Sequence, residues 1–431
     1  MRARHATALA VLTALVLTGP AVLAAPAVLA APAALAAPAV VAAPAVVAAP
    51  ADDLTTPAGF TGMSPTRVLD TRDALFVPNG QQRPLNPDEY YTTPLVAFSS
   101  HMPPATYPVV PADTTAVVVN VTATDPTADG YLSLSAAGHP GTVPATSSLN
   151  FTAGTTVSNL VTVAVTPGTN PAITVYNHVG TTDVVLDVVG YYQPGAADKY
   201  APLTPSRLVD SRTDGGRLGW GGVRSVQVAK PELGTADAHA VILNVTATEG
   251  SADSYLTVYP TGRERPYVGS NVNFASGRTV ANQVVVPVGA DGSIDIFNHV
   301  GSVDVVVDLV GFYGPSGAGL FSALTTPVRA YDTRSSTPLE PGGTRTVPVV
   351  ENHLMGAALN VTATEPTTDG HLTVYPAAAV SRPDTSTLNF TAGQTVANSV
   401  TTRTDGGLVK VYNNDGYTHV IADLTGVFVA G

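Results

Sequence analysis

The segment VVVNVTAT at residues 117–124 sets the fold class of this chain. Its side chains alternate with a period of two, so that Val117, Val119 and Val121 share one face while Asn120 and the threonines share the other. Valine and threonine favour extended backbone because their branched β carbons pack well on a pleated surface. The segment therefore predicts a β-strand.

This segment belongs to a long internal repeat. Its Asn-Val-Thr-Ala-Thr core begins at Asn120, Asn244 and Asn360, which are 124 and 116 residues apart. Other landmarks recur around it in the same order: an opening Arg-x-x-Asp-(Thr/Ser)-Arg motif, an Asn-Phe pair, an Asn-x-x-Gly turn and a closing apolar strand that contains an aspartate. A repeat of this length is a whole domain, because solenoid units span only about 20–50 residues.

We expect an all-β fold in which each copy forms a β-sandwich or a short barrel, because Val and Thr dominate and turn signals separate the strand-like runs. The repeats divide the chain into copy one at residues 58–194, copy two at 200–314 and copy three at 320–431. The linkers between them are short and rich in Gly, Ala and Pro, which favours copies that fold independently.

Residues 1–24 have the pattern of a secretory signal peptide: a basic head, an apolar run over Ala8–Leu17 and small-x-small cleavage sites. Proline at positions 20 and 26 interrupts the run too early for a membrane-spanning helix, so no span is expected in the mature chain. Residues 25–57 are rich in Ala and Pro and contain a repeated hexapeptide. This segment is either an extended stalk or a gene repeat without function, and the cleavage site within it is undetermined.

The composition excludes several classes of protein. The net charge is −12, and charged residues make up 12% of the chain against roughly 25% in an average protein. A nucleic-acid binder normally carries a basic surface, and this chain has the opposite sign of charge. The absence of cysteine excludes a disulfide scaffold, thiolate catalysis and cysteine-based zinc sites. No cofactor is expected.

The motif order Arg-x-x-Asp-Thr-Arg, Asn-Val-Thr, Asn-Phe-x-Ala-Gly and Leu-Asp-Val-Val-Gly-Tyr resembles a tandem β-rich module of secreted actinobacterial proteins. The resemblance covers roughly residues 58–431 and implies export and a β-rich module, for which no activity is established. Copy three departs from the pattern, because its closing strand lacks the paired aromatics found at Tyr191-Tyr192 and Phe312-Tyr313.

Each copy carries charged and amide side chains that we interpret as a structural network. A carboxylate in an apolar closing strand needs a partner, because an unpaired buried charge costs many kcal/mol. The arginine that opens each copy offers a planar fork of donors that suits such a carboxylate, or the amide of the Asn-Val-Thr motif. By strand alternation, Asp70 and Arg72 face one way and Arg67 the other. The candidate members are Arg67, Asp70, Asn120, Asp187, Arg207, Asp210, Asn244, Asp308, Arg329, Asp332, Asn360 and Asp423.

We predict a secreted, non-catalytic protein of the cell surface or extracellular space that binds cell-wall or other glycans through three weak sites. Exposed aromatic rings would supply the contacts. The candidate rings are Tyr131, Trp220, Tyr255, Tyr259 and Tyr375. A purely structural spacer fits the same pattern, and no metal ligands or catalytic residues are assigned.

Two alternatives remain open. The first is a secreted glycoside hydrolase that uses paired carboxylates such as Asp70 and Asp187. The second concerns the acidic turns typified by Asp125 and Asp129, whose oxygens could hold Ca²⁺. A loop of the Asp-x-Asp-x-Asp-Gly type is missing from the sequence, and Asp-Gly is a strong hairpin signal, so we interpret these turns as hairpin chemistry.

Overall fold

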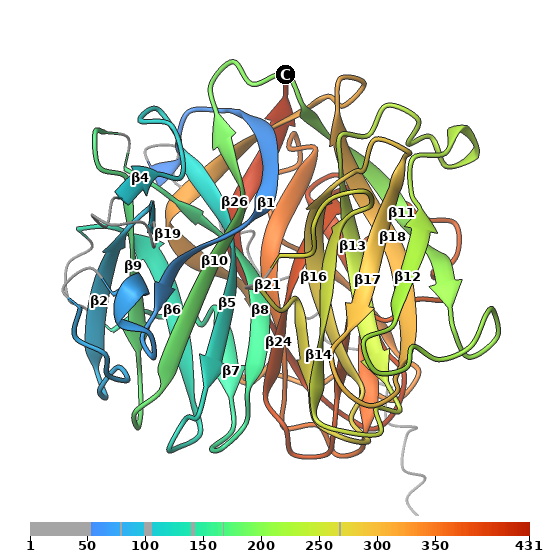
Figure 1. Cartoon of the computed structure of the whole chain (residues 1–431). Helices are drawn as coiled ribbons and strands as arrows, with labels where there is room; N and C mark the ends of the chain where they lie inside the picture. Colours follow the sequence, from blue (N-terminus) through green and yellow to red (C-terminus); the bar gives the residue numbers. More distant parts are fainter. Residues whose placement is uncertain (1–52, 78–79, 99–105, 139–142, 167, 267–268) are drawn as a thin grey trace, which may run out of the picture. The chain divides into compact units, whose positions relative to one another are not determined.

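The computed structural model describes residues 53–77, 80–98, 106–138, 143–166, 168–266 and 269–431 (Figure 1). The predicted signal peptide and most of the Ala/Pro-rich segment lie outside these residues. The described part of the chain is built from antiparallel β-strands and two short 3-10 helices, Ala74–Phe76 and Pro231–Leu233. The all-β prediction is confirmed. Among the described residues, none of the helices has the length and apolarity needed to cross a membrane.

Copy one forms two four-stranded sheets with the orders β1-β10-β5-β8 and β2-β9-β6-β7, and a two-stranded β3-β4 sheet. The strand that contains VVVNVTAT is β5, which lies in the first sheet between the closing strand β10 and β8 (Figure 1). The strands are β1 (Gly59–Asp70), β2 (Glu89–Pro94), β3 (Val96–Phe98), β4 (Thr106–Pro108), β5 (Ala116–Thr124), β6 (Gly130–Ala136), β7 (Leu149–Phe151), β8 (Val157–Ala164), β9 (Ala172–Asn177) and β10 (Asp183–Gln193).

Copies two and three repeat the second sheet of copy one, and their first sheets merge into one eight-stranded sheet. Their four-stranded sheets β12-β17-β14-β15 and β20-β25-β22-β23 correspond to the second sheet of copy one. The strands of copy two are β11 (Lys199–Asp210), β12 (Val223–Gln227), β13 (Ala240–Thr248), β14 (Ser254–Pro260), β15 (Val272–Phe274), β16 (Val280–Pro287), β17 (Ser293–Asn298) and β18 (Asp304–Gly314). Those of copy three are β19 (Gly319–Asp332), β20 (Thr344–Pro348), β21 (Gly356–Thr364), β22 (Gly370–Pro376), β23 (Leu388–Phe390), β24 (Val396–Arg403), β25 (Leu408–Asn413) and β26 (His419–Ala430).

Each copy has its own apolar core between its two sheets. In copy one, Val119 and Val121 of β5 belong to the same buried cluster as Leu132 of β6 and Val175 of β9. Corresponding clusters fill copies two and three. The period of two in β5 thus places its valines in the core, as expected of a sheet whose one face packs on a second sheet.

A fourth cluster is shared by all three copies. It contains large, fully buried rings, including Phe60 from copy one, Tyr200 and Tyr313 from copy two, and Phe321 and Phe428 from copy three. Tyr192 and Tyr313 share a hydrogen bond between their hydroxyls. Copies two and three also join in one eight-stranded sheet of the order β16-β13-β18-β11-β19-β26-β21-β24, where Tyr200 of β11 pairs with Gly319 of β19. The expectation of independently folding copies conflicts with this shared core, because a separated copy would expose these rings to water.

The glycine of each closing strand makes room for this shared cluster. A Cβ added at Gly190 would lie 2.4 Å from the Phe60 ring, one at Gly311 would lie 2.9 Å from the Tyr200 ring, and one at Gly426 would lie 2.3 Å from a ring carbon of Phe321. A side chain at these glycines would therefore clash with the opening strand of the same copy.

Candidate functional site

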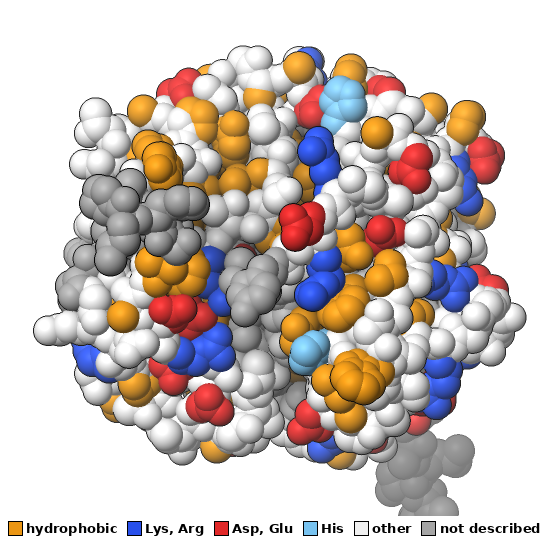
Figure 2. All heavy atoms as spheres, viewed as in Figure 1, with side chains coloured by type: hydrophobic (Ala, Val, Ile, Leu, Met, Phe, Trp, Pro, Cys, Tyr) orange, Lys and Arg blue, Asp and Glu red, His pale blue; other side chains and the backbone are white. Residues whose placement is uncertain are grey.

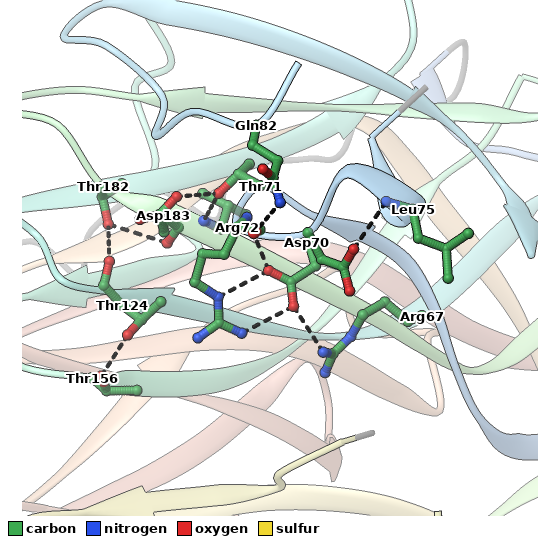
Figure 3. Close-up of polar contacts among 12 residues, drawn as sticks. Arg67, Asp70, Thr71, Arg72, Leu75, Gln82, Thr124, Thr156, Thr182 and Asp183 are labelled. Carbon is green, nitrogen blue, oxygen red and sulfur yellow. Dashed lines mark hydrogen bonds and ion pairs between the residues drawn. The ribbon is translucent and has the colours of Figure 1, made fainter. Parts of the chain in front are cut away.

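The opening arginine of copy one binds two carboxylates, and Figure 3 shows its contact with one of them, Asp70. Nε and Nη2 of Arg67 donate to the two carboxylate oxygens of Asp187 over 2.9 and 3.0 Å, and Nη1 donates to Asp70 Oδ2 over 2.9 Å. Arg72 holds the same Asp70 carboxylate through Nε and Nη2, both over 2.9 Å. Asp187 is 1% exposed. The cluster therefore joins the first and last strands of the copy.

A β-bulge brings Arg67 and Asp70 to the same side of β1. In the pairing of β1 with β10, Arg67 lies opposite Asp187 and Leu69 lies opposite Leu186, so Val68 is an extra residue. The same register shift follows the opening arginine in the other two copies. An extra residue reverses the alternation beyond it. The expectation that Arg67 faces away from Asp70 was wrong for this reason.

Copies two and three contain related clusters. Arg207 donates through Nε to Asp308 Oδ1 and through Nη1 to Asp210 over 3.2 Å. Nε and Nη2 of Arg329 donate to the Asp423 carboxylate over 2.8 and 3.3 Å, and Nη1 donates to Asp332 over 3.2 Å. Each opening arginine thus binds two carboxylates of its own copy.

Burial and pairing set the pKa values of the copy-one carboxylates. Burial raises the pKa of Asp187 above its usual value, against the hydrogen bonds and charge of Arg67. Burial also acts to raise the pKa of Asp70, but the hydrogen bonds and charge of Arg72, with the charge of Arg67, outweigh it and leave the pKa below its usual value. Both carboxylates therefore have arginine side chains as their hydrogen-bond donors.

The asparagines of the Asn-Val-Thr motifs bind a different partner from the one expected. The side chain of Asn120 donates to the carbonyl of Ser270 in copy two over 2.6 Å, and the side chain of Asn244 donates to the carbonyl of Ser386 in copy three over 2.5 Å. Asn360 completes the set by donating to the carbonyl of Ser147 in copy one over 2.6 Å. The expected arginine–asparagine pairing within a copy is thus replaced by hydrogen bonds between copies.

A second set of asparagines, which lie nine residues after each Asn-Phe pair, meets the first. Asn159 donates to Asn360 over 2.9 Å, and Asn398 donates to Asn244 over 3.1 Å. Asn282 donates to Asn120 over 3.5 Å, which is at the limit of a hydrogen bond. The contacts run from copy one to three, from three to two and from two to one, so they form a closed cycle. Recurrence of this asparagine in all three copies was the sequence signal for its role.

The candidate ligand-binding aromatics divide into buried, half-buried and exposed rings. Tyr259 and Tyr375 are 6% and 4% exposed, so they cannot present a ring to a ligand in this structure, and their assignment is corrected. Tyr131 and Tyr255 are half-buried, and each stacks on a histidine of the neighbouring turn, with ring centroids 4.5 Å apart in both pairs. Trp220 is 82% exposed.

Exposed apolar residues gather at the Asn-x-x-Gly turns. Val179 in copy one, Val300 in copy two and Tyr417 in copy three lie in or next to this turn, and they are 39%, 38% and 52% exposed. The loop that carries Trp220 is bound to the copy-two turn, because the backbone nitrogen of Asn298 donates to the Gly222 carbonyl over 2.9 Å. We call the following residues the turn surface: Val179, Val300, Tyr417, Trp220 and the histidine-stacked Tyr131 and Tyr255.

In the acidic turns that were considered for Ca²⁺, the acidic residues shape the backbone of the turn and accept hydrogen bonds from backbone nitrogens. Asp125, Glu249 and Glu365 adopt left-handed backbone conformations, with φ between 51° and 54°. The second acid of each turn caps a neighbouring loop: for example, Asp129 accepts from the backbone nitrogen of Ala153 over 2.9 Å. Within the described residues, His, Asp and Glu nowhere form a group of three or more that could hold a metal ion.

Charges of both signs are interspersed with apolar side chains on the face shown in Figure 2. No family model matches the chain, and no curated protein matches it. A solved structure described as "The Triple Jelly Roll Fold and Turret Assembly in an Archaeal Virus" shares 10% identity, with 88% of this chain and 98% of that chain covered and a TM-score of 0.16. A similarity this low supports no inference about the present chain.

Proposed function

We propose that this chain is a secreted, non-catalytic protein of three tandem β-sandwich copies, which binds a cell-wall or other extracellular glycan through the turn surface. The observation that carries the proposal is the recurrence of exposed apolar residues at the same turn in all three copies, at Val179, Val300 and Tyr417. Scattered single apolar residues on a surface are normal, but their repetition at the corresponding turn of each copy calls for an explanation. Val179 and Val300 occupy the third position of the turn, whereas Tyr417 directly follows the glycine of the copy-three turn.

A glycan suits this surface better than a charged polymer. Flat aromatic and imidazole rings can pack against the apolar face of a sugar ring, and Trp220 offers the largest such surface. The exposed histidine His299 covers the Tyr255 ring and extends the same platform. Three linked weak contacts can exceed the affinity of one by about 10²–10⁴ through effective concentration.

The arrangement of the carboxylates weighs against the hydrolase alternative. A glycosidase needs one carboxylic acid that protonates the leaving group and a second carboxylate that reaches the sugar. Asp187 is buried, and both it and Asp70 accept hydrogen bonds from Arg67. Such a pair, held by a guanidinium, is suited to joining strands.

A sedimentation assay tests the proposal. Residues 51–431 are incubated with insoluble peptidoglycan, chitin and cellulose, and the bound fraction is measured. We expect retention on at least one of them, and we expect Trp220→Ala combined with Tyr417→Ala to weaken it about tenfold or more. Val380→Ala is the matched control, because Val380 is fully exposed but lies on the loop after β22, outside the turn surface. Failure of the wild-type chain to bind any of the three would leave the spacer interpretation ahead.

A further inference from the structure

The closing aspartate of copy two differs from its two counterparts. Both carboxylate oxygens of Asp187 and of Asp423 accept hydrogen bonds from the opening arginine. In Asp308, Oδ1 accepts from Arg207, whereas Oδ2 is buried and has no hydrogen-bond partner among the residues that the structure describes. Arg207 Nη2 donates to the Asp384 carbonyl of copy three over 2.9 Å and makes no hydrogen bond to Asp308, whereas Arg329 Nη2 donates both to the Ala145 carbonyl and to Asp423.

An unpaired oxygen is costly at this place. Asp308 is 1% exposed and lies in an apolar strand. Leaving a buried acceptor without a donor costs about 1–3 kcal/mol, and more for a charged group. A donor that the protein itself does not provide would remove this cost.

Asp308 lines a small cavity between copies two and three. The cavity has a volume of about 20 Å³. A water molecule needs roughly 10–15 Å³ of such volume and two to four polar partners. Ser386 and Ser399 of copy three also line the cavity, and their hydroxyls can donate into it. Gln283 forms another part of the wall, but its amide is held by Ser399 and Thr401.

We propose that this cavity holds one water molecule, which donates a hydrogen bond to Asp308 Oδ2 and accepts one from a serine hydroxyl of copy three. The water thereby bridges copies two and three and supplies the donor that Asp308 Oδ2 lacks. A neutral donor fits because Arg207 already neutralises Asp308 at 2.5 Å, so a metal cation is not needed for charge balance.

A high-resolution crystal structure of residues 51–431 at neutral pH tests the proposal directly. We expect one water within about 2.5–3.0 Å of Asp308 Oδ2, and none against the carboxylates of Asp187 and Asp423, which serve as internal controls. An empty cavity, or a metal ion surrounded by several oxygen ligands, would overturn it.

A proton is the competing way to satisfy Oδ2, and a solution experiment distinguishes the two. Without a water, burial raises the pKa of Asp308 to about 6, despite Arg207. The folded state would then bind a proton more tightly than the unfolded state, and stability would be lost as pH rises through about 6. The other charged groups acting on this carboxylate are Asp210 on β11 and Asp384 on the loop after β22.

With water as the donor, we expect the difference in melting temperature between wild type and Asp308→Asn to stay constant between pH 5 and 7, because the carboxylate remains ionised. Asp291→Asn, in an exposed turn, is the control for general pH effects. A difference that grows in favour of the wild type as the pH falls from 7 to 5 would identify a proton and overturn the water proposal.

Discussion

Arg67, Arg207 and Arg329 each hold two carboxylates with one planar guanidinium, and this determines which substitutions the copies can tolerate. Arg207 and Arg329 use a third direction as well, since their Nη2 atoms donate to carbonyls of the neighbouring copy at Asp384 and Ala145. One side chain thus fastens the ends of its own copy and contacts the next. An ammonium group is a point charge and cannot reproduce this geometry.

We expect Arg207→Lys to lower the free energy of unfolding of residues 51–431 by about 1–3 kcal/mol, because at least one charge-assisted hydrogen bond is lost. Urea denaturation followed by circular dichroism measures this quantity. Arg278→Lys is the matched control, since Arg278 is an exposed arginine of the same copy. Identical unfolding curves for Arg207→Lys and wild type would refute the structural role of the guanidinium.

The acid limb of the stability curve should depend on the second arginine of the motif. The hydrogen bond from Arg212 lowers the pKa of Asp210, against the effect of burial. The unfolded state then binds the proton more readily than the folded state, so the stability from this pair is present above about pH 4 and is lost as the pH falls below it.

For this pair we expect Arg212→Gln to flatten the fall of the melting temperature between about pH 4 and 2. The measurement is a series of thermal unfolding curves across that range, with Arg278→Gln as the control. If the melting temperature of Arg212→Gln fell between about pH 4 and 2 as steeply as that of the wild type, the proposed role of the Arg212–Asp210 pair would be contradicted.

At the scale of elements, the first described residues pair with the opening strand of copy three, β19. Leu54 forms an isolated β-bridge with Leu324 and packs against the copy-three core. The backbone nitrogen of Thr55 donates to the Ala323 carbonyl over 2.9 Å, and its hydroxyl accepts from the nitrogen of Ala323 over 2.9 Å. Ala58 exchanges a pair of backbone hydrogen bonds with Phe321. We call residues 54–58 the N-terminal latch.

Removal of the latch should destabilise the chain without touching β1. We expect residues 59–431 to be less stable than residues 51–431 by roughly 2–4 kcal/mol, because a partly buried leucine and several hydrogen bonds are lost. The midpoints of thermal and urea unfolding measure this. Equal stability of the two forms would show that the latch contributes nothing. Signal cleavage anywhere within the hexapeptide repeats, which end at residue 48, would leave the latch intact.

At the scale of the whole molecule, the three copies depend on one another. Phe60, Tyr200 and Phe321 from the three opening strands all belong to the shared cluster. The asparagine cycle runs through all three copies, and Gln283 of copy two is hydrogen-bonded to Ser399 and Thr401 of copy three. Such contacts predict that the three repeats unfold as one cooperative unit.

We therefore expect residues 199–314, expressed alone, to lack a cooperative thermal transition as a monomer. Their separation from copies one and three exposes Tyr200, Ile242 and Tyr313, which are buried in the intact chain. Circular dichroism during heating, with sedimentation velocity to establish the oligomeric state, checks this. A monomeric fragment that unfolds in one sharp transition would restore the interpretation of independent copies.

Local sequence determined the strands and the threefold repetition. The alternation in residues 117–124 was sufficient to predict β5, because side-chain direction follows the parity of the position in a strand stretch without a bulge. The apolar surroundings of Asp187 likewise pointed to a cationic partner, since a buried charge is too costly alone. These inferences needed no knowledge of distant residues.

Only the tertiary structure decided which groups meet across copies. The extra residue at the bulge, Val68, reverses the in-and-out alternation of side chains beyond it. Arg67 and Asp70 therefore lie on the same side of β1. Asn120 finds its partner 150 residues away at Ser270, and the predicted sugar-binding rings Tyr259 and Tyr375 lie buried. A repeat pattern reports what each copy contains, but the contacts between copies follow from how three complete sandwiches pack together. That packing depends on the shapes of whole surfaces, which residue periodicity does not encode.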